Sequence, residues 1–169
     1  MIREIVLACL AAGALISSAS AQSLPAEGPV AVTYTATLTS PTQMMPIGGG
    51  KEYNVMNYAM TAANDDGNPV LNNMAGRCLF NVIADNSAKT RESHGFCTYS
   101  DNDGAQIFEQ CDFMPGAPNN CKLTGGTGKF EGIKADLVIT QVPPLKSNYE
   151  GIAQFIGHKK GSYKIVKTN

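Results

Sequence analysis

The chain has 169 residues, of which 43% are hydrophobic, and 13 basic and 14 acidic side chains give it a formal net charge of −1. This length is sufficient for one domain around a single core. Near-neutrality argues against nucleic acid as a partner, because a surface that follows phosphates needs clustered Lys and Arg. The one basic cluster is interpreted as a solvated edge or turn and consists of His158, Lys159, Lys160, Lys164 and Lys167.

The first 21 residues have the features of a secretory signal peptide. Arg3 lies in a short leader, residues 5–16 are an apolar run, and residues 19–21 are the small residues that signal peptidase recognises. We predict cleavage near Ala21, a periplasmic or secreted protein, and a single domain over residues 22–169. The apolar run is shorter than the about 20 residues that a membrane-spanning helix needs, so we predict no permanent membrane anchor.

The rest of the chain has the pattern of short strands, and no segment has a convincing helical period. The predicted strands are residues 30–38, 51–62, 77–84, 91–100, 105–113, 121–124, 130–140, 150–157 and 162–167. Turn residues separate them, for example at 101–104, 115–120 and 143–148. The pattern predicts an all-β domain, either a single antiparallel eight-stranded barrel or a β-sandwich. Gly95, Gly132 and Gly151 favour the barrel, because strand glycines suit the tight coiling of a closed sheet.

Four cysteines remain after removal of Cys9 with the signal peptide. An even number in an exported chain indicates two disulfides, and four cysteines allow three pairings. We expect Cys78 to pair with Cys97 and Cys111 with Cys121, because each bond then joins strands that are neighbours in the chain. A zinc site is disfavoured because the cysteines are widely and unevenly spaced.

Residues 125–132, with the sequence Gly-Gly-Thr-Gly-Lys-Phe-Glu-Gly, are the most informative segment of the chain. Four glycines in eight residues indicate a sharp bend that re-enters a sheet. The spacing of these glycines fits neither a phosphate-binding loop nor a dinucleotide-binding fingerprint. Asp101, Asp103 and Gly104 hint at a calcium loop, but a hairpin turn explains them better because the downstream acidic ligand is missing. We therefore predict no cofactor and no metal.

Together with residues 95–104, 107–108 and 157–163, the glycine-rich segment resembles small exported bacterial proteins of the allene oxide cyclase and dirigent barrel superfamily. The resemblance spans about residues 50–166. It implies an eight-stranded antiparallel barrel with an apolar interior, and it implies that the protein forms a homo-oligomer, since members often associate as dimers or trimers. It carries over no catalytic residue.

Isolated polar and aromatic side chains on strands are the candidate ligand-binding residues. Glu92 and His94 share a sheet face and form an acid–base pair if that face points into the barrel; the alternative is that they face solvent. Arg77 and Glu109 form a buried pair at the barrel mouth in one interpretation and exposed strand charges in the other. Tyr58 lines a pocket or packs in the core.

The same two alternatives hold for Tyr99, and no motif for nucleophilic catalysis is found.

Two functional classes remain. The favoured one is a non-catalytic exported barrel that binds a small apolar ligand or a protein partner. The alternative is a cyclase or isomerase that shapes a reactive apolar substrate inside the barrel, so whether the protein is an enzyme stays open. A cavity of roughly 300 Å³ with convergent polar groups would indicate ligand binding or catalysis rather than a scaffold.

Overall fold

The computed structural model describes residues 24–39, 43–142 and 152–167, and these residues form one antiparallel sheet. Apart from one 3₁₀ turn, η1 (Gly128–Phe130), all of the elements are strands. The strands are β1 (Glu27–Leu38), β2 (Gln43–Gly48), β3 (Lys51–Asn64), β4 (Met74–Asp85), β5 (Thr90–Ser100), β6 (Gln106–Phe113), β7 (Asn120–Gly126), β8 (Ile133–Gln141) and β9 (Gln154–Ile165). The predicted signal peptide and its cleavage site near Ala21 lie outside the described residues.

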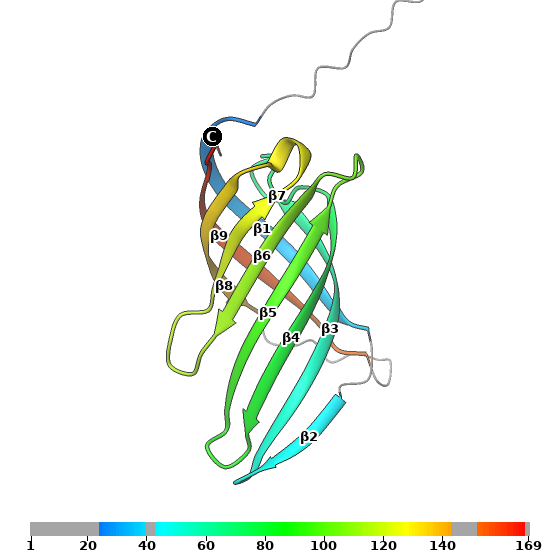
Figure 1. Cartoon of the computed structure of the whole chain (residues 1–169), viewed down its shortest axis with the longest axis vertical. Helices are drawn as coiled ribbons and strands as arrows, with labels where there is room; N and C mark the ends of the chain where they lie inside the picture. The colour runs from blue at the N-terminus through cyan, green and yellow to red at the C-terminus, as the bar shows by residue number, and fades with distance from the viewer. Residues whose placement is uncertain (1–23, 40–42, 143–151, 168–169) are drawn as a thin grey trace, which may run out of the picture.

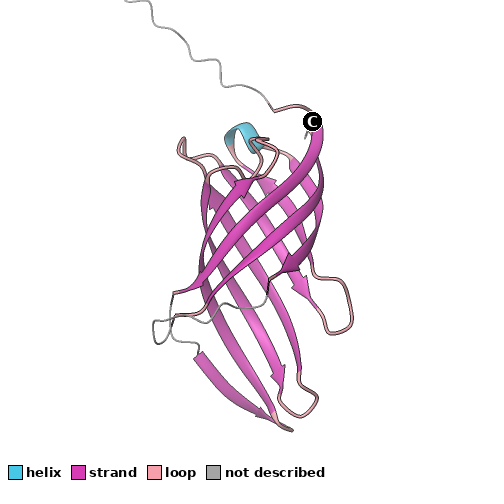
Figure 2. Cartoon of the chain, turned by 180° about the vertical axis from the view of Figure 1, so that it is seen from behind, coloured by secondary structure: helices cyan, strands magenta, loops and turns pink. Residues whose placement is uncertain are grey.

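The sheet closes into an eight-stranded barrel because β1 pairs with β9 on one side and with β3 on the other. The order around the barrel is β1-β9-β8-β7-β6-β5-β4-β3, so each of the strands β4 to β8 lies between its neighbours in the chain. Figures 1 and 2 show the strands tilted around a common axis. The predicted barrel is confirmed, and the sandwich alternative is wrong. No helix in the described part of the chain is long and apolar enough to span a membrane.

Strand β2 lies outside the barrel and was missed by the sequence prediction. It pairs with residues 51–55 of β3, beyond the part of β3 that pairs with β1, and so extends the sheet below the barrel (Figure 1). Its sequence, Gln-Met-Met-Pro-Ile-Gly, has no alternation of apolar and polar residues, and all six residues are exposed. Pro46 is compatible with such an edge strand but not with the middle of a sheet.

The last two predicted strands form one continuous strand, β9. Gly157, the predicted end of the first of these strands, and Gly161, just before the predicted start of the second, both lie inside β9. A side chain at Gly157 would overlap the ring of Tyr34, its direct partner on β1. Glycine is therefore required here by packing and does not end the strand.

The same arrangement of a glycine opposite an aromatic ring occurs four times in the barrel. In each case the two residues are direct partners on neighbouring strands, and the ring fills the space of the missing side chain. The pairs are Gly28–Tyr163, Gly76–Tyr99, Gly95–Phe80 and Gly157–Tyr34. Because the interior of an eight-stranded barrel is just wide enough for side chains, these glycines make room for large rings.

The glycine-rich segment bends as predicted, between the end of β7 and the start of β8. Gly132 has φ +76°, and a side chain there would collide with the carbonyl oxygen of Val166. Phe130, in η1, is fully buried in the core. Gly132 therefore precedes β8 and is not inside a strand, while Gly151 lies outside the described residues.

Both expected disulfides are present, Cys78–Cys97 between β4 and β5 and Cys111–Cys121 between β6 and β7. Each bond joins residues that are direct partners across an antiparallel pair. All four cysteines are buried on the inner face of the barrel. The bonds link β4 to β5 and β6 to β7 on the wall that carries the cavity described next.

Candidate functional site

The barrel contains a cavity of about 320 Å³. Residues near the ends of β6 and β8 and the starts of β5 and β9 line it, so it lies toward the end of the barrel opposite η1. Most of its wall is apolar or aromatic, and both disulfides contribute to it. The large apolar lining residues are Met56, Met60, Phe80, Val82, Phe113, Val142 and Phe155.

Four aromatic rings from four strands surround this space. Tyr58 contacts Phe80 and Phe155 edge-on, with ring centroids 6.0 and 5.4 Å apart. Phe80 stacks on Phe113 at 5.7 Å. Such contacts contribute about 0.5–1.5 kcal/mol each beyond the area that they bury, so they hold the wall in a defined shape.

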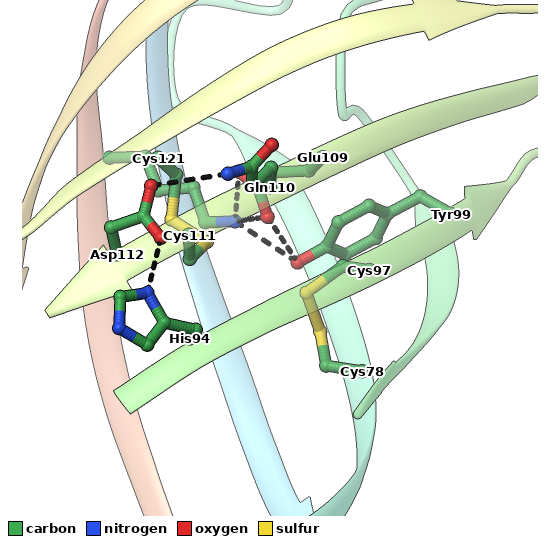
Figure 3. Close-up of a disulfide and its surroundings, with 10 residues drawn as sticks. Cys78, His94, Cys97, Tyr99, Glu109, Gln110, Cys111, Asp112 and Cys121 are labelled. Atoms are coloured by element: carbon green, nitrogen blue, oxygen red, sulfur yellow. Dashed lines mark hydrogen bonds and ion pairs between the residues drawn. A yellow bond between two sulfur atoms is a disulfide. The ribbon is translucent and has the colours of Figure 1, made fainter. Parts of the chain in front are cut away.

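One side of the cavity carries a buried ion pair between Glu109 on β6 and Lys159 on β9. The Lys159 Nζ lies 2.6 and 2.5 Å from the two carboxylate oxygens and 3.0 Å from the Tyr99 hydroxyl. The Tyr99 hydroxyl in turn donates to the Glu109 Oε2 at 3.4 Å (Figure 3). All three donors of the ammonium group are thus used, which is the geometry that makes a buried ion pair tolerable.

Two tyrosines next to this ion pair are held in their neutral form. Burial, with a smaller effect of the Glu109 charge, raises the pKa of Tyr99 well above its usual value. Burial also raises the pKa of Tyr34 to about 12. The Lys159 ammonium lies 5.0 Å from the centroid of each ring, so both rings also stabilise the cation through their faces.

Polar residues concentrate toward the end of the cavity away from η1. Arg91 and Ser93 near the start of β5, Asn119 just before β7 and Gln141 at the end of β8 line this part. The Tyr58 hydroxyl donates to the sulfur of Met56 at 3.0 Å. The site therefore has an apolar body with a small number of polar groups, as is typical of ligand pockets.

The structure brings together only some of the predicted site residues. Tyr58 and Glu109 both line the cavity. Arg77 does not pair with Glu109: it is on the outer face of β4, next to the inward-facing Cys78, and its Nε donates to Asn57 at 2.9 Å. Of the two interpretations, exposed strand charge holds for Arg77, because alternation along β4 directs it outward, whereas Glu109 is buried and has Lys159 as its partner.

Glu92 and His94 do form a hydrogen-bonded pair, but on the outer face of β5. The His94 Nε2 lies 3.2 Å from the Glu92 Oε1, and its Nδ1 lies 2.7 Å from the Asp112 Oδ1 on β6. Hydrogen bonds to Asp112 and then to Glu92 raise the pKa of the imidazole. Figure 3 shows the His94–Asp112 pair separate from the Tyr99–Glu109 cluster. The pair therefore takes no part in the cavity.

Sequence reasoning missed both cations of the cavity, Lys159 and Arg91, as well as its polar residues Ser93, Asn119 and Gln141. Lys159 was grouped with a solvated basic cluster, and that interpretation is wrong for this residue, which is 2% exposed. The signal that could have located it is its alternation with Gly157, Gly161 and Tyr163, which places it on the inner face once β9 is recognised as one strand.

Metal-ligand spacing occurs at one place in the described residues, where ligand atoms of Cys97, Glu109 and Cys111 lie within 4.8 Å of one another. Both cysteines are in disulfides, so the thiolates that bind metals are not present. The segment considered as a calcium loop in the sequence is a turn, in which the Lys129 ammonium lies 2.6 Å from Asp101 and 3.3 Å from Asp103.

The fold and the cavity define a small closed antiparallel β-barrel with a mainly apolar internal site. No family model and no curated protein matches the chain.

Proposed function

We propose that this protein is an exported barrel that binds one small, mainly apolar molecule in its interior. The cavity of about 320 Å³ is the observation that carries this proposal. Its volume lies at the lower end of the range for ligand pockets, and its wall has the expected few polar groups. Taking about 30 Å³ for a water-sized group, the space suits roughly ten such groups.

Export is part of the proposal. The two disulfides are compatible with an oxidising compartment, and residues 1–21 have the pattern of a signal peptide. Mass spectrometry of the protein recovered from the periplasm or medium tests this directly, because we expect a chain that starts near residue 22. A chain that retains Met1 would contradict it.

Filling the cavity tests ligand binding. Ala36 lines the cavity and lies opposite Met60 and Phe155, so Ala36→Phe places a ring into the space. Ala59 is exposed on β3, and Ala59→Phe makes the same substitution outside the barrel. We expect decan-1-ol, a neutral probe of suitable size, to bind the wild-type protein and Ala59→Phe in calorimetry and to bind Ala36→Phe at least tenfold more weakly.

Native mass spectrometry of the wild-type protein complements this titration. A small molecule that co-purifies and is lost on denaturation would identify the natural ligand. Equal binding by the filled variant and the wild type would place the bound probe outside the cavity and would contradict the proposal.

The second candidate is an isomerase or cyclase, and the buried Glu109–Lys159 pair in the cavity wall is the observation that favours it. In this case the barrel would confine an apolar substrate, exclude water and hold it beside these charges. The allene oxide cyclase and dirigent barrel superfamily, which the sequence resembles, includes such enzymes. Incubation of the co-purified compound with wild type and Glu109→Gln tests it: turnover that the substitution abolishes would favour catalysis.

Homo-oligomer formation also remains a proposal. Leu79, Phe96 and Phe108 lie on the outer faces of β4, β5 and β6 and are 49%, 66% and 36% exposed. Leu79 and Phe96 are direct partners, and Phe108 lies opposite Thr98 two residues further along β5, so the three form one apolar patch. Patches of this kind often mark interaction sites. Light scattering of wild type and Phe96→Lys tests whether the patch supports self-association.

A further inference from the structure

We propose that the molecule bound in the cavity is an organic monoanion, with its apolar body inside the barrel and its carboxylate paired with Arg91. This inference rests on the proposed function and adds the chemical class of the ligand. It follows from how the charges of the cavity are distributed and from which of them are already neutralised.

The described lining of the cavity carries three side chains that are charged at neutral pH, namely the cations Arg91 and Lys159 and the anion Glu109. Glu109 and Lys159 bind each other at 2.5 Å and cancel. The lining is therefore left with one positive charge, which belongs to Arg91. A ligand that brings one negative charge balances the site.

Lys159 is unsuitable as the anion-binding group. Its three donors are used by the two Glu109 oxygens and the Tyr99 hydroxyl. A ligand carboxylate there would have to displace Glu109 and leave that carboxylate buried without its cation, which is strongly unfavourable. The polar end of the ligand is thus directed away from the ion pair.

Arg91, unlike Lys159, is a cation of the cavity lining that forms no ion pair within the described residues. It is exposed on β5 yet lines the cavity, and Ser93 lies two residues further on the same face. Its positive charge acts on the cavity, since it offsets part of the rise that burial causes in the pKa of Tyr58. Among residues 24–39, 43–142 and 152–167 it forms no ion pair.

Two acidic residues near Arg91 in the sheet have other partners, whereas Glu52 of β3 lies on the same face as Arg91, two strands away and opposite Ala84, and forms no ion pair within the described residues. Asp85, at the end of β4, accepts the backbone N–H groups of Ser87 and Ala88 and lies 3.7 Å from the Lys51 ammonium. Glu92, next in the chain, binds His94 on the outer face. Within the described residues no carboxylate is paired with the guanidinium, which can hold a ligand carboxylate through two parallel hydrogen bonds.

Two probes of equal length separate charge recognition from apolar binding. Decanoate and decan-1-ol share their chain and differ in the head group. For the wild-type protein with its disulfides intact, at neutral pH and low salt, we expect calorimetry to give about tenfold tighter binding of decanoate, the size of effect that a charged hydrogen bond supplies. The preference should decrease as salt is added.

Arg91→Gln should bind decanoate and decan-1-ol with equal affinity, so that the preference for the anion is lost. The matched control is Arg77→Gln, which neutralises an arginine on the outer face of the neighbouring strand and should keep the preference. Equal affinity of the wild type for both probes, or a preference that survives in Arg91→Gln, overturns this inference but leaves the apolar cavity site in place. Failure of the wild type to bind either probe overturns both the inference and the proposed function.

Discussion

Replacing Lys159 by Met is expected to destabilise the barrel strongly. The substitution keeps an unbranched side chain of similar length but leaves the Glu109 carboxylate, which is 1% exposed, with only the Tyr99 hydroxyl at 3.4 Å as a partner. Breaking a buried ion pair by removing one member costs about 3–5 kcal/mol, because it leaves an uncompensated charge. We expect the free energy of unfolding to fall by about this amount at pH 7.

The matched double variant distinguishes a lost attraction from an uncompensated charge. Glu109→Leu with Lys159→Met replaces the pair by apolar side chains, a change that is often neutral or stabilising. The Tyr99 hydroxyl then loses both of its partners, which costs about 1–3 kcal/mol. The double variant should therefore be more stable than either single variant and within about 2 kcal/mol of the wild type.

Urea unfolding followed by far-ultraviolet circular dichroism, without reductant, measures all four proteins. The double-mutant cycle should give a coupling energy of at least about 3 kcal/mol, well above the deviation from additivity of about 0.5 kcal/mol that independent sites show. Single variants that each lose less than about 1 kcal/mol, or a double variant that loses the sum of the two single effects, would show that the pair is not the closed buried unit described above.

Three further outcomes are expected. Cys78→Ala with Cys97→Ala should lower the free energy of unfolding by about 3 kcal/mol, because the bond closes a loop of 19 residues; unchanged urea midpoints would contradict this. An NMR titration should give His94 a pKa above the usual 6.5, and Asp112→Asn should lower that pKa. Because folding raises the pKa, the protonated imidazole stabilises the folded state below pH 6.5, and this stabilisation is lost as the pH rises through the raised value. Tyr34, with a pKa of about 12, should stay neutral at pH 11 in spectrophotometric titration of the folded protein and should ionise near 10 after unfolding. The free energy of unfolding should therefore fall between pH 10 and 12. A native Tyr34 that titrates near 10 would refute its burial.

Local patterns in the sequence were sufficient for the fold class. Alternation of apolar and polar residues identified seven of the eight barrel strands within a few residues, because a strand with one buried face must alternate. The disulfide pairing also followed from local order, since neighbours in the chain are neighbours in an antiparallel barrel. Strand β9 was divided in two because Gly157 and Gly161 have no side chains, and so the local pattern could not show that Gly157 packs against the ring of Tyr34 and Gly161 against Asp136 and Leu137 of β8.

The site depended on information that no single strand contains. Alternation shows that Glu92 and His94 share a face, but only the closed sheet decides that this face is the outer one. The same decision separates Arg77 from Glu109 and joins Glu109 to Lys159, 50 residues away in the sequence. The sequence by itself therefore determined seven of the barrel strands, the disulfide pairing that the structure shows and the all-β class, with a barrel favoured over a sandwich. Closure of the sheet decided which charges are buried together and which of them line the cavity, because burial and pairing depend on strands that are distant in the chain.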